Sequence, residues 1–221
     1  MKKILAITLI LILAFSLLTA CGDNGGGNSA PPTSTNGGGG NSTNSPAQQN
    51  ADIIKSSEII TQEDTARILG KDVTVDKLDE MNPMTPGAVH TSYGSTGVTI
   101  ALSITLYQNA ALDLSNSTHK ALFDGGGIGS TNGGVRNQYE KGTIVEAIPV
   151  EGIGDWAFIS GLGKKVSTSI DIGYGDYRIF ISTTIIPEGS KLGDETTLAL
   201  RKEILTEAGK LAIERLEAII G

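Results

Sequence analysis

The sequence VTIALSITLY, at residues 98–107, decides the fold class of this chain. Aliphatic residues fill its even positions, and smaller or hydroxyl-bearing residues fill most of the positions between them. Because successive side chains of a strand point to opposite faces of a sheet, this alternation predicts a strand with one face on a hydrophobic core. Turn-forming residues at 94–97 precede it, which predicts a hairpin with another strand at residues 89–93.

Further strands are predicted on both sides of this hairpin. An earlier strand is expected at residues 73–78, and four later ones at residues 143–148, 156–159, 166–172 and 177–186. The last two alternate in the same way and are separated by Gly-Tyr-Gly-Asp at residues 173–176. Since tight turns join antiparallel neighbours, we expect a mostly antiparallel sheet of about 5–7 strands.

Helices are predicted at both ends of this strand-rich region. Thr61 is placed to cap a short helix of about two turns that ends at Gly70, with Ile60 packing before the cap. A weaker helical pattern covers residues 112–123.

The most regular predicted element is a long helix that follows Asp194. From Leu198 onward, apolar residues recur at spacings of three and four, which predicts an amphipathic helix of ~25 residues and about 38 Å. Its polar side is mixed and acidic, whereas helices that lie on membranes favour Lys and Arg there. We therefore expect it to pack on one face of the sheet, and the fold class to be α+β.

The N-terminus predicts export and lipid attachment. Lys2 and Lys3 precede a run of 15 uncharged, mostly apolar residues at 4–18, which is shorter than the ~20 that a membrane span needs. The run ends in Leu18-Thr19-Ala20-Cys21, which resembles the lipobox of bacterial lipoproteins. The resemblance implies a signal peptide at residues 1–20, cleavage before Cys21, a diacylglyceryl thioether on Cys21 and often a third acyl chain such as palmitate on its amine. The alternatives are a plain secretory signal or a short membrane anchor.

The 29 residues at 22–50 predict a flexible tether. Eight are glycine, and none is more apolar than alanine or proline. Such a segment buries too little surface to offset the entropy cost of ordering, and as a flexible chain it reaches roughly 30 Å. The sequence thus divides into a signal peptide (1–20), an acylated cysteine with its tether (21–50) and a single globular domain (51–221).

Charge and cysteine content exclude several classes of function. Removing Lys2 and Lys3 from 17 basic residues leaves 15 against 24 acidic ones, a net charge of −9. Nucleic acid is therefore not an expected partner, because phosphate binding depends on clustered Lys and Arg. Cys21 is the only cysteine, so the domain has no disulfide, thiol nucleophile or cysteine-based metal site.

No catalytic, cofactor-binding or metal-binding residues are predicted in the domain. Its two histidines, His90 and His119, have no second histidine at metal spacing, and no Gly-x-Ser-x-Gly motif is present. The glycine-rich stretch from Gly125 to Gly134 lacks the ending of a phosphate-binding loop, so we expect a surface loop there. Acidic pairs such as Asp194 and Glu195 lie at predicted helix starts. Their negative charges stabilise the positive end of the helix dipole there, so a catalytic role is not needed to explain them. The one site residue predicted is Cys21, for lipidation.

Three segments of the domain resemble one known group. They are VEGIGDWA at residues 150–157, ITQEDTARILG at residues 60–70, and KLAIERL at residues 210–216. Together they are similar to small envelope lipoproteins of unknown function from mycobacteria and other actinobacteria. The resemblance implies a compact α/β layer fold and no established catalytic residues.

The leading functional hypothesis is a non-enzymatic binding or accessory module of the cell envelope. The acyl chains on Cys21 would hold it to the cell membrane on the extracytoplasmic side, with an envelope protein or a small ligand as its partner. The alternatives are an envelope hydrolase whose site is scattered in the sequence, or a structural assembly factor. A deep pocket that brings a histidine to a carboxylate and a hydroxyl would favour the hydrolase. Solvent-exposed rows around Thr99, Ser103 and Tyr107 would favour binding.

Overall fold

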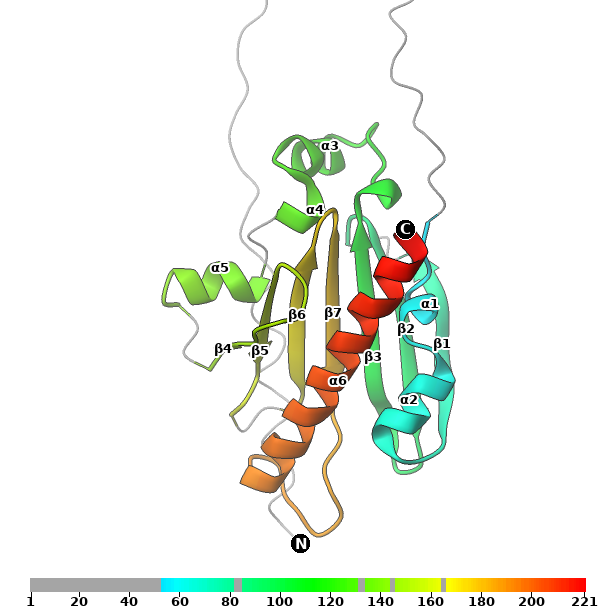
Figure 1. The fold of residues 1–221 in the computed structure, drawn as a ribbon, viewed down its shortest axis with the longest axis vertical. Coiled ribbons are helices and arrows are strands. Elements are labelled where there is room, and N and C mark those ends of the chain that lie inside the picture. The colour runs from blue at the N-terminus through cyan, green and yellow to red at the C-terminus, as the bar shows by residue number, and fades with distance from the viewer. Residues whose placement is uncertain (1–52, 82–84, 131–133, 144–145, 164–165) are drawn as a thin grey trace, which may run out of the picture. The chain divides into compact units, whose positions relative to one another are not determined.

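One seven-stranded sheet organises the domain (Figure 1). The computed structural model describes residues 53–81, 85–130, 134–143, 146–163 and 166–221, so Cys21, the predicted signal peptide and the tether lie outside the described residues. The strand order is β1-β2-β3-β7-β6-β5-β4, and every neighbouring pair is antiparallel. The α+β prediction is confirmed. The strands are β1 (Val73–Met81), β2 (Ala88–Ser95), β3 (Val98–Gln108), β4 (Ile148–Pro149), β5 (Trp156–Ser160), β6 (Thr168–Tyr174) and β7 (Tyr177–Thr183).

Strand β3 lies near the middle of the sheet, as its alternating sequence predicts. Leu102, Ile104 and Leu106 are fully buried, and Ile104 pairs with Ile181 of β7. Ile100 was expected on the same buried face but is 40% exposed. The reason is local, because the β7 partner ends opposite Leu102 and the β2–β3 register shifts beyond Tyr93.

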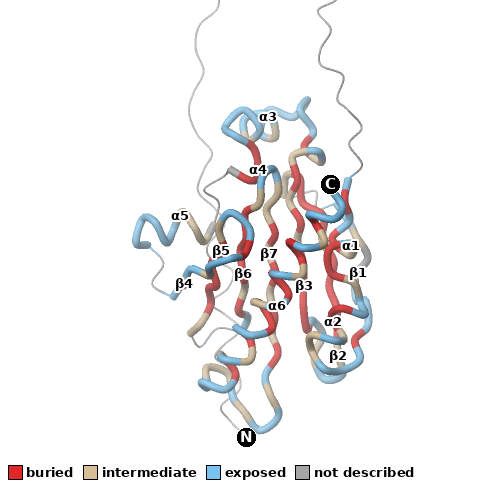
Figure 2. Tube along the Cα trace, viewed as in Figure 1, coloured by how far each residue is buried: buried red, intermediate tan, exposed pale blue. Residues whose placement is uncertain are grey.

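Helix α6 (Glu195–Ile220) covers one face of the sheet, together with α1 (Ser56–Ile59) and α2 (Gln62–Leu69). Its buried residues include Leu205, Ala208 and Leu216 from the predicted apolar stripe, and Figure 2 shows buried positions along the facing strands. Gly209 allows close approach, since a Cβ there would lie 3.0 Å from the Ile172 side chain. The predicted long helix packed on the sheet is confirmed.

The predicted cap of α2 is present. The Thr61 hydroxyl accepts a hydrogen bond from the Asp64 N–H at 3.1 Å, and Gly70 ends the helix in the left-handed conformation with φ of 63°. Ile60, at the position before the cap, is fully buried. Helix α1 was not predicted, because four residues are too few to show a periodic pattern.

The segment between β3 and β4 differs most from expectation. It contains η1 (Asn109–Ala111), α3 (Ser117–Asp124), α4 (Gly127–Ser130) and α5 (Gly134–Glu140). Helix α3 begins five residues later than the pattern at 112–123 indicates, because Asn116 caps the N–H groups of Thr118 and His119.

The surface loop expected from Gly125 to Gly134 is present at the exposed turn residues Gly125 and Gly126, but the prediction is wrong for residues 127–129. Gly127, Ile128 and Gly129 are buried in or beside α4. A Cβ on Gly129 would lie 1.6 Å from the Gly175 carbonyl oxygen, and one on Gly87 would lie 2.4 Å from the Ile128 side chain. Gly129 and Gly87 therefore allow close packing that a side chain would prevent.

Several strand ends were also predicted too generously. Strand β4 begins only at Ile148, with residues 144–145 outside the described part of the chain. Strand β6 begins at Thr168 and leaves Val166 71% exposed, while β7 ends at Thr183 rather than at Ile186. Apolar residues beside a strand resemble strand residues in the sequence, so the pattern alone overextends the ends.

Candidate functional site

The sheet face opposite α6 carries a row of serines across five strands. In this serine row, each residue pairs in register with the next, in the order Ser92, Ser103, Ser182, Ser169 and Ser160. Ser103 and Ser182 share a hydrogen bond of 2.8 Å, and Ser160 and Ser169 share one of 3.1 Å. Ser103 is only 9% exposed, whereas Ser182 and Ser169 are half-buried.

His90 lies next to one end of the serine row. Its Nε2 is 2.8 Å from the Ser92 hydroxyl, and its Nδ1 is 2.9 Å from the Thr105 hydroxyl. In a neutral imidazole one nitrogen donates a hydrogen bond and the other accepts one. One of these two hydroxyls therefore accepts from the ring, and the other donates to it. The structure thus brings one predicted histidine to two hydroxyl groups on neighbouring strands.

The 2.8 Å contact between Ser92 and His90 resembles the pairing of a nucleophile with its base. The Thr105 hydroxyl occupies the Nδ1 side, where a catalytic triad has a carboxylate. Strand β2 pairs with β1 on one side and with β3 on the other, and Ser92 lies in both ladders. Backbone N–H groups committed to neighbouring strands cannot form an oxyanion hole. The geometry supports a hydrogen-bonded polar surface.

A buried ion pair lies one row further along the same face. Arg178 donates to both carboxylate oxygens of Asp171, at 2.7 and 2.8 Å, and Asp171 is fully buried. The guanidinium also lies 5.1 Å from the centre of the Tyr107 ring. Burial lowers the pKa of Arg178, but the bond and charge of Asp171 outweigh it and raise that pKa above its ordinary value. Burial also raises the pKa of Tyr107.

Aromatic side chains close this face at the β5 side. The Tyr139 ring of α5 packs against Phe158 at 4.9 Å between centroids, and the Arg136 guanidinium lies 5.5 Å from the centre of the Trp156 ring. A Cβ on Gly173 would lie 2.1 Å from the Trp156 ring, so the indole covers this glycine on the neighbouring strand. Helix α5 therefore packs on the face opposite α6.

The distinctive VEGIGDWA segment has a structural role in this arrangement. The Asp155 carboxylate accepts a hydrogen bond of 2.8 Å from the N–H of Gly175, in the turn between β6 and β7. Gly154 takes a φ of 59°, and a Cβ there would lie 2.6 Å from the Gly173 carbonyl oxygen. The turn therefore needs glycine in order to bring β5 alongside β6.

The remaining residues considered from the sequence do not form a site. His119 accepts a hydrogen bond of 3.0 Å from the Asp113 N–H, and Asp194 accepts one of 2.7 Å from the Lys191 N–H. Both contacts close local turns. Among the residues that the structure describes, no group of three or more His, Cys, Asp or Glu is arranged to hold a metal ion.

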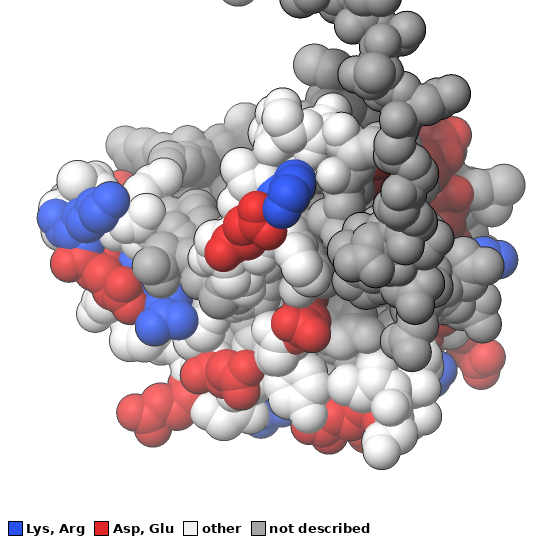
Figure 3. Space-filling model, turned by 90° about the horizontal axis from the view of Figure 1, so that it is seen from above, with Lys and Arg blue, Asp and Glu red and all other residues white. Residues whose placement is uncertain are grey.

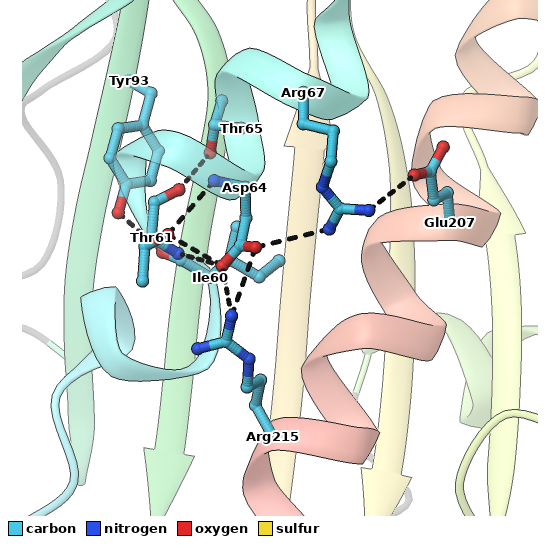
Figure 4. A network of polar contacts seen from close by, with 8 residues as sticks. All are labelled: Ile60, Thr61, Asp64, Thr65, Arg67, Tyr93, Glu207 and Arg215. Atoms are coloured by element: carbon cyan, nitrogen blue, oxygen red, sulfur yellow. Dashed lines mark hydrogen bonds and ion pairs between the residues drawn. The ribbon is translucent and has the colours of Figure 1, made fainter.

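A polar network joins α2 to α6 on the other face of the sheet (Figure 4). The Asp64 carboxylate accepts from the Thr61 N–H and hydroxyl and from Arg215 of α6, the last at 3.1 Å. Burial raises the pKa of Asp64, but the bonds from Thr61 and the charge of Arg215 outweigh it and leave that pKa below its ordinary value. Arg67 extends the network to Glu207, at 3.8 Å. This network fastens the N-terminal helices to the long helix.

A second carboxylate fastens α1 to the sheet. Asp79 of β1 accepts hydrogen bonds from the Ser56 and Thr91 hydroxyls, each 2.7 Å, and from the N–H and hydroxyl of Ser57. Burial raises the pKa of Asp79, but these bonds outweigh it and lower that pKa below its ordinary value.

We predict that both carboxylates make the domain sensitive to acid. A carboxyl group whose pKa is lower in the folded state stabilises that state above its unfolded pKa, and the stabilisation is lost as the pH falls through the folded pKa. Stability is therefore expected to fall below about pH 4, the ordinary range for aspartate. In chemical denaturation at a series of pH values, Asp79→Asn should reduce the proton uptake on unfolding by up to about one proton. An unchanged pH dependence would contradict the assignment, and Asp72→Asn, at an exposed position, is the control.

The sequence reasoning missed the buried charges. Asp171 lies between Ile170 and Ile172, and Arg178 lies between Tyr177 and Ile179, so the alternation of each strand places both on the face away from the core. The turn at residues 173–176 joins the two strands, so the sequence already indicated that Asp171 and Arg178 lie close together on one face. Arg201 carried no such signal.

Comparisons with protein-family models, with curated proteins and with solved structures gave no match to this chain. The described residues also contain no helix with the length and hydrophobicity needed to cross a bilayer.

Proposed function

We propose that this protein is a lipid-anchored, extracytoplasmic binding module that uses the sheet face opposite α6 to hold a neutral, hydroxyl-rich ligand such as a glycan. The observation that carries the proposal is the composition of that face. Hydroxyl groups from several strands lie in register beside aromatic rings on this face. A sheet face that packs against another hydrophobic layer consists mainly of aliphatic residues, and this face does not.

The accessible part of this face determines the ligand chemistry. Thr105, Phe180, Ser182 and Trp156 are all half-buried and keep some exposed surface. Three serines of the row and the ion-paired carboxylate are buried, namely Ser92, Ser103, Ser160 and Asp171. Hydroxyls both donate and accept hydrogen bonds, and aromatic rings offer flat apolar contact. Because Arg178 is paired with Asp171, the face presents little net charge. These features suit a sugar, which combines hydroxyl groups with apolar ring faces.

The test uses Trp156, the only tryptophan, as a reporter. The unacylated chain of residues 22–221 is titrated with neutral oligosaccharides, beginning with a β-1,4-linked N-acetylglucosamine tetramer. We expect a saturable change in fluorescence, and we expect Phe180→Ala to weaken it at least about tenfold, since buried aromatic contacts dominate recognition. Lys202→Ala, exposed on α6, is the matched control and should bind normally. If Phe180→Ala bound the oligosaccharide as tightly as the unmodified chain, the ligand would not bind on the sheet face opposite α6.

The second candidate function is an envelope hydrolase, and the observation that favours it is the 2.8 Å contact between His90 and Ser92. The same titration separates the two functions, because a binding module returns the oligosaccharide intact. Cleavage of the probe that disappears in Ser92→Ala would favour the hydrolase.

The anchor is tested separately through Cys21. With the acyl chains present, we expect the processed protein to fractionate with membranes, because two chains give stable anchoring. Cys21→Ser is expected to move essentially all of the protein to the soluble fraction or to leave it mislocalised. If the variant still fractionated with membranes after signal cleavage, lipid attachment at Cys21 would not be the anchor.

A further inference from the structure

The chain enters the described domain at one defined end of the sheet. The Ile54 N–H donates to the Gln108 side-chain oxygen at 3.0 Å, and the Gln108 side-chain nitrogen donates to the Ile54 carbonyl oxygen at 2.7 Å. Gln108 is the last residue of β3 and is buried. The segment that precedes Ile53 is therefore attached at the end of the sheet where η1 and α3 follow β3.

Exposed apolar side chains lie at this same end. Ile53 is 45% exposed. Leu114, three residues before α3, is 36% exposed, and Phe123, in the last turn of α3, is 44% exposed. Met81, at the end of β1 that pairs with Val89, is exposed as well. Val75, Ile100, Val166 and Ile186 are exposed toward the opposite end of the sheet, so the apolar residues alone do not distinguish the two ends. The entry of the chain beside Gln108 distinguishes this end.

No apolar residue of helix α3 belongs to the described hydrophobic core. None of its residues is buried, and it packs against α4 rather than on the sheet. In Figure 1 it projects beyond the ends of β3 and β7. Its Asn116 cap and the Lys120–Asp124 ion pair hold the helix locally. Neither Leu114, which precedes the helix, nor Phe123 belongs to the described core.

We propose that this end of the domain, defined by Ile53, Leu114 and Phe123 and called the α3 end, rests on the bilayer that holds the acyl chains of Cys21. The inference rests on the proposed lipid anchor. As the tether that the sequence predicts, the 29 residues at 22–50 would keep the domain within roughly 30 Å of the membrane. Tethering raises the effective concentration of the domain at the membrane surface. A contact too weak to bind a free protein to the membrane is therefore enough to orient a tethered one.

The contact is apolar rather than electrostatic. Lys120 and Asp124 neutralise each other at 2.6 Å, and Asp113 adds a negative charge beside Leu114. Figure 3, which views the molecule from above Figure 1, shows acidic and basic groups side by side and no continuous basic patch on the described surface that is visible. Anionic lipid is therefore not required, unlike for polybasic membrane segments.

The absence of a second cysteine permits a site-specific test. Once Cys21 is acylated, Phe123→Cys supplies the only free thiol, which is labelled with an environment-sensitive fluorophore. The acylated protein is reconstituted in phosphatidylcholine vesicles that contain lipids with a nitroxide quencher near the headgroup. The control is Ile186→Cys, which is equally exposed and follows β7 at the opposite end of the sheet.

We expect quenching at position 123 to be several times that at position 186, with or without added phosphatidylglycerol. A second variant carries Leu114→Ser and Phe123→Ser with the label at Ser117→Cys. It should stay membrane-bound and equally stable but lose the quenching, because the replaced side chains are exposed. Equal quenching at the two ends, or quenching that requires phosphatidylglycerol, would overturn the inference while leaving the anchor intact. A reactive Cys21 thiol in the processed protein would instead refute the anchor, and this inference with it.

Discussion

Replacing Arg201 by alanine is expected to lower the free energy of unfolding by about 3–5 kcal/mol, a large share of the total stability of a domain of this size. Arg201 lies in α6 and is fully buried. It donates to the Ile185 and Thr184 carbonyl oxygens at 2.7 and 2.9 Å and lies 3.5 Å from the Thr168 hydroxyl. These contacts join α6 to the segment where β7 ends and to the start of β6.

The expected loss has two parts. Truncation leaves buried carbonyl groups without a donor, at about 1–3 kcal/mol each, and opens a cavity beneath α6. Some of this is offset because a buried cation is costly, and burial lowers the pKa of Arg201 accordingly.

Urea denaturation of three proteins separates these contributions. Arg201→Met keeps much of the side-chain volume and removes the donors, so its stability should fall between those of the alanine variant and the unmodified chain. Lys202→Ala, at the exposed neighbouring position, should be close to neutral. If Arg201→Met were as stable as the unmodified chain, the hydrogen bonds to the carbonyl groups would contribute nothing.

Replacing Asp171 by alanine is the second change with a large expected effect. It leaves Arg178, whose side chain is 17% exposed, without the carboxylate that neutralises it. Breaking a buried ion pair from one side costs about 3–5 kcal/mol, because a desolvated charge remains. Arg178→Ala should cost at least as much, because it leaves the fully buried Asp171 carboxylate unpaired and also removes the cation–π contact with Tyr107.

A double-mutant cycle tests the coupling directly. If the pair is the main reason for each loss, the variant with both residues replaced should be more stable than Asp171→Ala alone. Strictly additive losses would show that the two side chains act independently. Far-ultraviolet circular dichroism of each variant confirms that the sheet remains folded before stabilities are compared.

The fold class followed from local patterns because those patterns reflect burial. The alternation in β3 and the spacing of three and four in α6 each record which face of an element meets the core. Thr61 and Gly70 marked the ends of α2 because a cap and a left-handed residue are requirements of a single helix end. Such features depend on neighbours along the chain, so the sequence reveals them.

The candidate site could not be read in the same way. Ser92, Ser103, Ser182, Ser169 and Ser160 lie on five strands, and only the register of four separate strand pairs places them in one row. A shift of one residue in any pair would turn part of the row to the opposite face. His90 likewise gained its partners from register, since Thr105 belongs to the neighbouring strand.

By itself, the sequence determined the sheet-forming segments, the covering helix and the prediction of an acylated Cys21, each of which depends on a contiguous pattern. Only the tertiary structure decided that Arg201 is buried, that the glycines around Ile128 pack closely, and that the α3 end meets the incoming chain. The physical reason is that burial of a charge and close approach of two backbones depend on what lies opposite. Residues that are distant in the sequence provide that environment.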